Sequence, residues 1–457
     1  MTATETAGLL RAPHHGDRLR RANASPVATK RIVHLGVGAF HRAHQAWYTA
    51  HASDSEQWLI TAFTGRSSTI ADQLAPQGGV YTLIERGPER DTFAHIDSIH
   101  SVLPGTETGA LAAAIADAET AVVTLTITES GYRLTPAGQP DVEDEAVRSD
   151  LEILRGLSDS VALTDNLGLT TALARLVAGL ELRRRYQGPS IALVSCDNIP
   201  GNGDFLARGV AALALAVSPA LRHWVDSRVS FVSTSVDRIT PRVTADDALT
   251  VLEETGWTDA APVVTEPFSD WVLSGAFPSG RPAWETSGAT FVENIEPYEA
   301  RKLWMLNGAH TLLAFHGPVL GHETVSEAIR DPRCRVAVNA WWDEAARHLP
   351  ADLGIPAYRA ALLERFENPR IEHRLEQIAE DGTTKLMLRI VPIALAELKA
   401  GRDARACAFV FATWMRATAS GSPRERLRLI SPELAANVSF LRRVVDALAT
   451  LNKSLDK

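Results

Sequence analysis

The chain has 457 residues, too many for one ordinary hydrophobic core, so its length predicts two or three domains. Its net charge of −9, with no block of basic residues, argues against nucleic acid or an anionic lipid surface as a partner. No apolar run approaches the length of about twenty residues that a membrane span needs, so a position in the membrane is not expected.

The first 30 residues contain no apolar stretch followed by a small-residue cleavage site, and we expect them to form a loose leader. The three cysteines, Cys196, Cys334 and Cys407, are far apart and lack the spacing of metal ligands. This pattern favours a reducing compartment, with the cytoplasm as the default, and argues against structural zinc.

The N-terminal part of the chain alternates between short β-branched runs and helical patterns. The first predicted strand, Arg31–Leu35, leads into a glycine turn and then a helix. Further strands are predicted at Trp58–Phe63, Ala121–Thr128, Ser190–Ser195 and Val229–Ser235, and helices at Leu111–Ala118 and Thr170–Arg185. This alternation indicates an α/β fold with a mostly parallel sheet that helices cover on both faces.

After about Asn294 the sequence changes to long segments rich in alanine, leucine and arginine, with few strand signals. Helices are predicted at Pro297–Phe315, Arg335–Arg347 and Ala404–Ala417. Proline and glycine in Pro262–Asp270 and Phe277–Pro282 are interpreted as breaks that lead up to this change. We therefore place a domain boundary near residue 290.

A glycine turn follows the first predicted strand. Glycines there let a dinucleotide pyrophosphate approach the backbone, and the next helix offers N–H donors. The candidate cofactor-binding residues are Gly36, Val37, Gly38, Ala39 and Phe40. His41 replaces the third glycine of the usual G-x-G-x-x-G pattern, and a plain strand-to-helix turn would explain two glycines equally well.

The longer string GVGAFHRAHQ, residues 36–45, resembles the opening motif of the mannitol dehydrogenase family, the polyol-specific long-chain dehydrogenases. Further segments similar to that family occur in its order: TITESGY at 126–132, SCDN at 195–198, VDRITP at 236–241, TEPF at 265–268 with Trp271, and 297–310. The resemblance implies an N-terminal Rossmann-type NAD(P)-binding domain, residues 1–290, and a mainly α-helical substrate and catalytic domain, residues 291–457, with the active site between them.

Oxidation of a secondary alcohol requires a base for the hydroxyl proton, donors for the developing alkoxide and a nicotinamide that takes the hydride. The resemblance implies Lys302 as the base, Asn198 and Asn307 as amide donors, His310 as a substrate-orienting residue and Asp237 as a positioning carboxylate. A lysine base needs its cation destabilised by burial or neighbouring positive charge. If their segment is one α-helix, Lys302, Asn307 and His310 lie on one side of it.

These residues also have plainer interpretations. Taken alone, Lys302 would be a solvated surface lysine, and His310 a packed or capping histidine. Asn198 could end a strand with a side-chain turn, and Asp237 could form a local salt bridge with Arg238.

A later segment, 365–385, resembles the second substrate segment of the family, with Arg374, Gln377 and Lys385 as candidate substrate-binding residues. Its pattern is more similar to fructuronate reductases, which interconvert D-fructuronate and D-mannonate, than to mannitol 2-dehydrogenases. A sugar acid carries a carboxylate, and Arg374, Lys385 or Arg389 could provide the cation that recognises it. Arg374 and Arg389 could equally be solvated charges on a helix face.

The cofactor is predicted to be NAD or NADP. NAD-preferring proteins usually end their second strand with an acidic residue that binds the ribose hydroxyls. Here Trp58–Phe63 is followed by Thr64–Thr69, which is neutral except for Arg66. Arg66 could therefore contact an adenosine phosphate or point into water. Thr128, in the second motif, is a further candidate cofactor-binding residue.

The combined prediction is a metal-independent, NAD(P)-dependent oxidoreductase that interconverts a secondary alcohol and a ketone of a sugar acid, as fructuronate reductases do. The alternative within the family is a mannitol 2-dehydrogenase or another polyol dehydrogenase, acting on arabinitol or on the tagaturonate–altronate pair. The alternative from another class is a cofactor-binding regulator, which would be expected to have lost Lys302, Asn198 or Asn307. We expect a monomer or a weak homo-oligomer.

Overall fold

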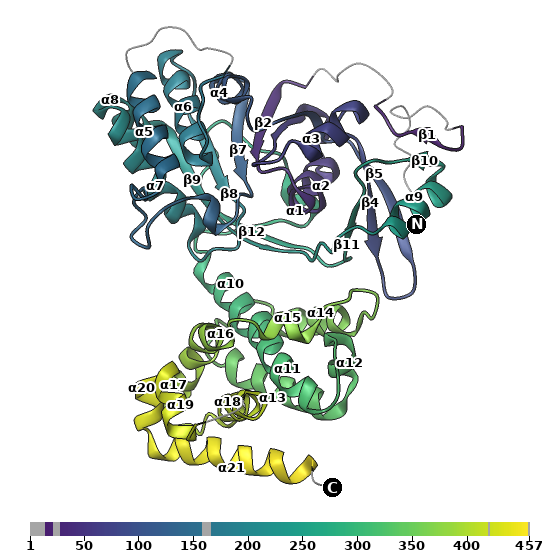
Figure 1. Ribbon diagram of the computed structural model, residues 1–457, viewed down its shortest axis with the longest axis vertical. Coiled ribbons are helices and arrows are strands. Elements are labelled where there is room, and N and C mark those ends of the chain that lie inside the picture. The colour runs from purple at the N-terminus through teal and green to yellow at the C-terminus, as the bar shows by residue number, and fades with distance from the viewer. Residues whose placement is uncertain (1–13, 22–27, 158–165, 419–420, 456–457) are drawn as a thin grey trace. The chain divides into compact units, whose positions relative to one another are not determined.

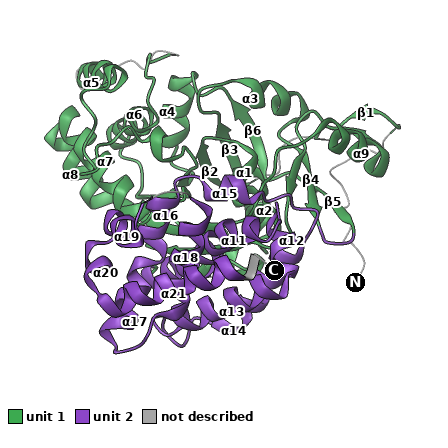
Figure 2. Cartoon of the chain, turned by 60° about the horizontal axis from the view of Figure 1, so that its bottom comes forward, with its two compact units in different colours: residues 1–86, 90–295 green, residues 87–89, 296–457 purple. Residues whose placement is uncertain are grey.

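The computed structural model describes residues 14–21, 28–157, 166–418 and 421–455, so most of the predicted leader lies outside the described residues. The chain divides into two compact units (Figure 2). Unit 1 comprises Met1–Arg86 and Arg90–Ile295, and unit 2 comprises Gly87–Glu89 and Glu296–Lys457. None of the helices in the described part of the chain is both long and apolar enough to cross a membrane.

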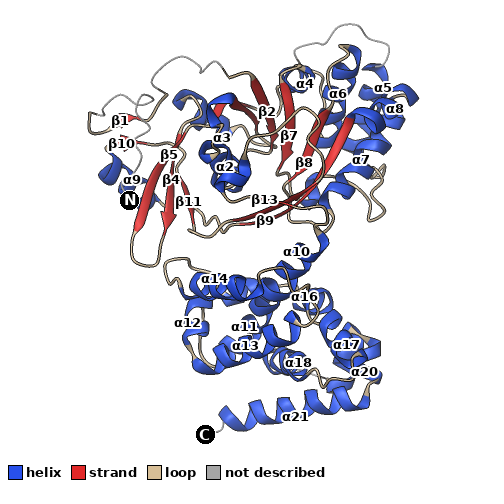
Figure 3. Ribbon diagram, turned by 180° about the vertical axis from the view of Figure 1, so that it is seen from behind, coloured by secondary structure: helices blue, strands red, loops and turns tan. Residues whose placement is uncertain are grey.

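Unit 1 is built around an eight-stranded sheet (Figures 1 and 3). Its strands are β2 (Lys30–Leu35), β3 (Trp58–Phe63), β6 (Ile99–Leu103), β7 (Thr120–Leu125), β8 (Ile191–Ser195), β9 (Val229–Asp237), β12 (Asp270–Ser274) and β13 (Thr290–Phe291). They lie in the order β13-β12-β9-β8-β7-β2-β3-β6. The strands from β6 to β9 are parallel, whereas β12 is antiparallel to β9.

Two hydrophobic cores cover the two faces of this sheet. One contains α4 (Thr108–Ala116), α5 (Glu145–Leu157), α6 (Ala172–Arg185), α7 (Asn202–Val217) and α8 (Pro219–Arg228), and the other contains α1 (Ala39–Ala43), α2 (Gln45–His51) and α3 (Thr69–Leu74). Neighbouring residues of one strand belong to opposite cores, as Val122 and Val123 of β7 do. This alternation explains why β7 and β8 are buried along their whole length, and it confirms the predicted parallel sheet with helices on both faces.

Smaller sheets complete unit 1. Their strands are β4 (Tyr81–Arg86), β5 (Asp91–Ile96) and β11 (Val263–Thr265) in one sheet and β1 (Asp17–Arg18) and β10 (Trp257–Thr258) in another, next to helix α9 (Ala245–Thr255). The interpretation of Pro262–Asp270 as a break before the second domain is wrong, because this segment contains β11 and the first residue of β12. A three-residue strand between two prolines is too short to show a period of two in the sequence.

Unit 2 contains helices and, in its described residues, no β-strand, which confirms the mainly helical C-terminal prediction. Its helices are α10 (Glu296–Arg301), α11 (Gly308–Val319), α12 (Val325–Arg330), α13 (Pro332–Ala346), α14 (Ile355–Glu367), α15 (Leu375–Ala379), α16 (Gly382–Arg389), α17 (Val391–Lys399), α18 (Arg405–Ala417), α19 (Pro423–Ile430), α20 (Pro432–Ala436) and α21 (Val438–Leu455). Helix α11 packs against α13, α15 and α18, so its residues are almost all buried.

Candidate functional site

The glycine turn at the end of β2 lies directly against the end of β7. Gly36 has a φ of 98°, and a Cβ atom at this position would lie 2.2 Å from the carbonyl oxygen of Thr126. Only glycine fits there without moving the backbone. Gly38 differs, because the one atom near its Cβ position is the Gly36 oxygen at 3.7 Å. The turn therefore leaves backbone at Gly38 that a ligand can approach closely.

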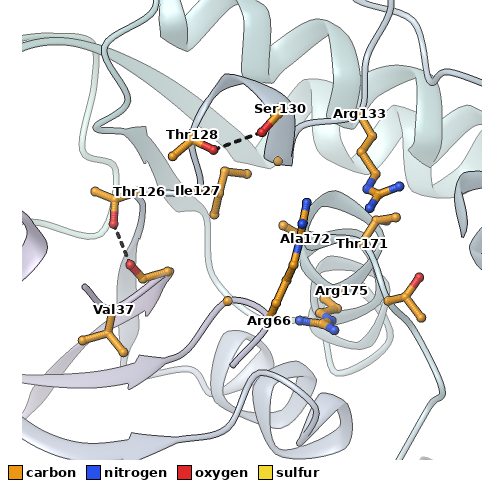
Figure 4. A pocket seen from close by; sticks show the side chains of 14 residues that line it. Val37, Arg66, Thr126, Ile127, Thr128, Ser130, Arg133, Thr171, Ala172 and Arg175 are labelled. Atoms are coloured by element: carbon orange, nitrogen blue, oxygen red, sulfur yellow. Dashed lines mark hydrogen bonds between the residues drawn. The ribbon is translucent and has the colours of Figure 1, made fainter. Parts of the chain in front are cut away.

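A cavity of about 360 Å³ lies beside this turn (Figure 4). It is lined by Gly36, Val37, Gly65, Arg66, Thr126, Ile127, Thr128, Ser130, Gly131, Arg133, Thr170, Thr171, Ala172 and Arg175. Gly36, Gly65 and Thr126 are residues that follow β2, β3 and β7, so the cavity lies at the carboxyl ends of parallel strands. Open α/β sheets bind their ligands at this edge.

Four of the predicted cofactor-binding residues, Gly36, Val37, Arg66 and Thr128, line this cavity. The other three, Gly38, Ala39 and Phe40, are not among its lining residues and form the start of α1. The assignment of all seven to the cofactor remains a prediction.

Asp197, which the sequence analysis did not single out, shapes one wall of the cavity. Its buried carboxylate accepts hydrogen bonds from the Thr128 N–H at 2.7 Å, the Ile127 N–H at 3.2 Å and the Tyr132 hydroxyl at 2.8 Å. Burial raises the pKa of Asp197, and these three bonds oppose that shift. Thr128 has a φ of 65°, a left-handed conformation that is strained for a β-branched residue. The carboxylate therefore holds a strained loop in place.

Asn198 and Asp237, two predicted catalytic residues, both follow or end strands of the large sheet. Asn198 is exposed in the turn after β8, and Asp237 is the buried last residue of β9. Arg238, the proposed partner of Asp237 in a local salt bridge, forms an ion pair with Glu85 at 3.0 Å. Both predicted residues thus lie near the carboxyl edge of the sheet.

The other three predicted catalytic residues lie in unit 2, on a helical segment that changes its hydrogen bonding. Helix α10 ends at Arg301, a π-helical turn runs from Lys302 to Asn307, and α11 begins at Gly308. The expectation of one uniform α-helix is therefore wrong. Hydrogen bonds in a π-helix run between residues five apart, so Lys302 and Asn307 lie about one turn above each other. In an α-helix they would be separated by about 140° around the axis.

Two fully buried tryptophans of α13 hold this π-helical turn. The indole N–H of Trp341 donates to the carbonyl of Trp304, and that of Trp342 donates to the carbonyl of Met305, both at 2.8 Å. Gly308 lets the helix come this close, because a Cβ atom there would lie 2.6 Å from the Trp341 ring. Lys302 itself is half-buried on this segment.

His310 is buried in unit 2, one turn beyond Asn307. Its ring packs against those of Phe366 and His373, with both centroid separations at 4.8 Å. Burial lowers its pKa well below the ordinary value, and His373, Arg365 and Arg389 lower it further. The imidazole is therefore neutral at neutral pH, so it can donate one hydrogen bond and accept another.

The predicted substrate-binding residues have different surroundings. Arg374 forms surface ion pairs with Glu323 at 3.0 Å and with Glu372 at 3.6 Å, and Gln377 is exposed. Lys385 is half-buried, and its ammonium donates to the carbonyl of Ile378 at 3.0 Å. Arg374 thus already has carboxylate partners, whereas Lys385 has a neutral one.

Arg389, which the sequence analysis proposed only as one possible cation, contacts one of the predicted catalytic residues of unit 2. Its guanidinium donates to the carbonyl of Asn307 at 3.1 Å and to the Thr311 hydroxyl at 3.0 Å. Among the described residues it forms no ion pair with a carboxylate, and burial lowers its pKa to about 10. Burial also lowers the pKa of Lys385, and the charge of Arg389 adds to this effect.

In the described residues no group of three or more histidine, cysteine, aspartate or glutamate side chains is arranged to hold a metal ion. Cys196, Cys334 and Cys407 are all buried free thiols. Cys196 precedes Asp197 and contributes to the core beneath the sheet.

Comparison with known proteins supports the same division of the chain. Residues 30–286 match the family model of the mannitol dehydrogenase Rossmann domain, and residues 294–425 match that of the mannitol dehydrogenase C-terminal domain. The D-mannonate oxidoreductase of Escherichia coli K12 is 36% identical over 401 residues, which are 85% of this chain and 80% of that protein. The D-arabinitol 4-dehydrogenase of Ralstonia nicotianae is 37% identical over 396 residues, or 84% of this chain and 82% of that protein.

A solved structure is also similar. The mannitol 2-dehydrogenase of Pseudomonas fluorescens, in a ternary complex with NAD and D-mannitol, has a TM-score of 0.76 and 28% sequence identity to this chain. The similarity covers 97% of each chain.

Proposed function

Because this chain belongs to the mannitol dehydrogenase family, whose members are nicotinamide-dependent oxidoreductases that act on CH–OH groups, we propose that it interconverts D-mannonate and D-fructuronate. Its cofactor is NAD or NADP. The observation that carries the sugar-acid assignment is Arg389, a half-buried guanidinium without a carboxylate partner in the described part of the chain.

A half-buried arginine without an anion is costly, because its charge has lost water and gained only neutral acceptors. Arg389 donates to two such acceptors, the carbonyl of Asn307 and the hydroxyl of Thr311. A substrate carboxylate would supply the missing negative charge and could bind the planar guanidinium through two parallel hydrogen bonds. Neutral polyols have no such group, so this arrangement favours a sugar acid over mannitol or arabinitol.

The proposed roles of the other residues follow from their chemistry. Lys302, half-buried at the start of the π-helical turn, accepts the proton of the substrate hydroxyl. Asn307 and Asn198 donate hydrogen bonds to the oxygen as negative charge develops on it. Neutral His310 orients the substrate, and Asp237 positions polar groups. The reaction releases one proton and one hydride from the alcohol.

We propose that the cavity of unit 1 holds part of the dinucleotide. Gly36 provides the tight turn, and Gly38 offers backbone with free space at its Cβ position. We propose that residues Gly36 to Phe40, Arg66 and Thr128 bind the cofactor. When bound, the nicotinamide supplies the acceptor for the hydride.

The test is a substrate panel followed by nicotinamide absorbance. Fructuronate, tagaturonate and fructose are reduced with NADH and NADPH, and mannonate, mannitol and arabinitol are oxidised with NAD and NADP. We expect fructuronate and mannonate to give the highest kcat/KM. Arg389→Gln should raise the KM for fructuronate by about ten-fold or more, because the loss of one charge-assisted hydrogen bond weakens binding by about that factor. The KM for neutral fructose should change much less.

Two further variants separate the roles. Lys302→Ala should lower kcat by several orders of magnitude and leave cofactor binding nearly unchanged, whereas Lys399→Ala, at an exposed lysine of α17, should change neither. Arg374→Gln is the matched control for Arg389→Gln, because Arg374 is already paired with Glu323 at the surface.

Several outcomes would contradict the proposal. If Arg389→Gln raised the KM for fructuronate and for fructose equally, Arg389 would not be the residue that binds the substrate carboxylate. If Arg374→Gln raised only the KM for fructuronate, Arg374 would be that residue. Highest activity on arabinitol or mannitol would make this chain a polyol dehydrogenase. Cofactor binding without turnover on any member of the panel would support the regulator alternative.

A further inference from the structure

The cavity of unit 1 is unusual in its charge. Three arginines, Arg66, Arg133 and Arg175, are among its lining residues, and no aspartate or glutamate is. In the view of Figure 4 these arginines lie on the side of the cavity away from Val37 and Thr126. The ribose of NAD presents two hydroxyl groups, which an acidic side chain binds best. The lining lacks this acceptor.

Arg66 is the first charged residue after the strand end where that acidic side chain would be expected. It follows Phe63, the last residue of β3, by three residues, and it is exposed. No hydrogen bond or ion pair of its side chain is formed with the described residues. Its guanidinium is therefore available to a ligand in the cavity.

Arg175 approaches the same loop from α6. A Cβ atom on Gly105 would lie 2.9 Å from Nη1 of Arg175 and 2.6 Å from the carbonyl oxygen of Gly65. Gly65 directly precedes Arg66, so Arg175 reaches the backbone that carries Arg66. Its Nε donates to the carbonyl of Leu169 at 3.0 Å, which orients the guanidinium without neutralising it.

The other charges near the cavity already have partners. Arg133 forms an ion pair with Asp144. Asp150 is buried and accepts hydrogen bonds from the N–H groups of Thr170 and Thr171, so it satisfies the start of α6. Its charge also attracts Arg175, but no ion pair between the two is formed in the described residues. The positive charge that a ligand would meet therefore comes mainly from Arg66 and Arg175.

We propose that Arg66 and Arg175 bind the 2′-phosphate of NADP, and that this chain prefers NADP to NAD. The inference rests on the proposed function only in assigning the cavity to the dinucleotide. Two guanidinium groups at the end of β3 suit a phosphate dianion, which accepts several charge-assisted hydrogen bonds. The diol of NAD, in contrast, would face donors alone.

The experiment measures binding by calorimetry, without turnover. NADP and NAD are titrated first, followed by three fragments: adenosine 2′,5′-bisphosphate, adenosine 3′,5′-bisphosphate and 5′-AMP. We expect NADP to bind at least about ten-fold more tightly than NAD, and the 2′,5′-bisphosphate to bind more tightly than both other fragments. The 3′,5′-bisphosphate has the same charge, so it separates a specific phosphate site from general attraction of anions.

Variants assign the effect to the two arginines. Arg66→Gln and Arg175→Gln should each weaken NADP binding by about ten- to hundred-fold and change NAD binding by less than about two-fold. Arg228→Gln, at an exposed arginine of α8 outside the cavity, removes the same charge and should change neither. Because Arg66 is exposed, its variant is expected to fold normally.

Equal or tighter binding of NAD would overturn the proposal, as would an unchanged NADP to NAD ratio in both arginine variants. Equal binding of the two bisphosphates would reduce the cavity to a non-specific anion site and would also overturn it. NADP preference without turnover on any sugar acid would contradict the proposed function and leave this inference standing.

Discussion

At the scale of single residues, Asp197 shows how one buried carboxylate supports the candidate cofactor site. Three donors, the N–H groups of Ile127 and Thr128 and the hydroxyl of Tyr132, converge on its two oxygens. Thr128 has a positive φ and would relax to an ordinary conformation if these bonds were lost. The loop that lines the cavity therefore depends on a residue that is not one of its lining residues.

Asp197→Asn tests this dependence. The amide keeps the shape of the side chain, but it has one acceptor oxygen instead of two and presents N–H groups to other donors. We expect the free energy of unfolding to fall by about 1–3 kcal/mol and the Kd for the cofactor to rise. Urea denaturation and calorimetry measure the two effects.

A control for this prediction is Asp226→Asn, at an exposed aspartate of α8 that is paired with Arg222. This variant should change the free energy of unfolding by less than about 1 kcal/mol. If the two substitutions lowered the free energy of unfolding by the same small amount, contacts other than those of Asp197 would hold the loop that contains Thr128.

Residues of the cavity could be predicted where they follow a strand closely or, like Thr128, lie in a segment that resembles the family. Gly36, Val37 and Arg66 come shortly after strands that short runs of β-branched and apolar residues make visible, so their place at the edge of the sheet could be predicted. Arg175 could not be predicted, and Asp197, which closely follows β8, was not singled out because its role depends on the loop 127–132 that it binds. Arg175 is the fourth residue of a helix rich in arginine, and nothing in the sequence distinguishes it from Arg183 or its neighbours, which are far from the cavity lining.

At the scale of elements, the π-helical turn depends on contacts that are distant in the sequence. A π-helical turn is rare because its hydrogen bonds leave some carbonyls poorly satisfied. Here the indole N–H groups of Trp341 and Trp342 bind the carbonyls of Trp304 and Met305. The sequence of this segment predicts an ordinary helix, because the tryptophans that stabilise the turn lie 37 residues later.

Trp342→Phe removes one of these donors and keeps an aromatic ring. We expect a lower free energy of unfolding, since the carbonyl of Met305 loses one of its two donors and keeps only the N–H of Gly308, at a cost of about 0.5–1.5 kcal/mol beyond the lost volume. Lys302 and Asn307 are the first and last residues of the π-helical turn, so a distorted turn would displace both side chains. We therefore expect kcat to fall by a larger factor than KM rises. Denaturation and steady-state kinetics measure these changes.

Trp271→Phe is the matched control for the unfolding measurement. Trp271 is as fully buried as Trp342, but its indole nitrogen has no hydrogen-bond partner in the described structure, so only volume is lost. Equal destabilisation by the two substitutions would show that the hydrogen bond to Met305 contributes little.

The elements of the large sheet differ in how well the sequence predicts them. Strands β3 and β8 consist mostly of apolar residues because both of their faces are covered, and their predicted positions agree with the structure to within one residue. Strands β6, β12 and β13 of this sheet were missed, and so were β4, β5 and β11 of a smaller sheet. In the smaller sheet β4 pairs with β5 antiparallel and with β11 in parallel, and β5 alternates between half-buried and exposed residues, so its apolar signal is weak.

At the scale of the whole molecule, each unit buries neutral histidines. Burial lowers the pKa of His34 to about 3 and that of His316 to about 4, and it lowers the pKa values of His41 and His310 well below the ordinary range. His34 and His41 belong to unit 1 and stack with their ring centroids 3.3 Å apart, whereas His310 and His316 belong to unit 2. Both units therefore contain groups that resist protonation when folded.

Because of these histidines, we expect the free energy of unfolding to fall already at pH values above those at which carboxylates take up protons. A histidine in the unfolded chain takes up a proton below about pH 6.5, while a buried one stays neutral, so stability falls as pH decreases through this range. From pH 7 to pH 5 each histidine should lower the free energy of unfolding by at most about 2 kcal/mol. Asp197 acts in the opposite direction, because burial raises its pKa.

Urea denaturation at pH 7, 6 and 5, followed by tryptophan fluorescence, measures this dependence. His41→Leu should make the dependence on pH shallower, because one of the groups that the folded state keeps neutral is gone. His223→Asn, at an exposed histidine of α8, should leave the slope unchanged. A free energy of unfolding that stays constant from pH 7 to pH 5 in the unmodified protein would mean that water or rearrangement lets the buried rings take up protons in the folded state.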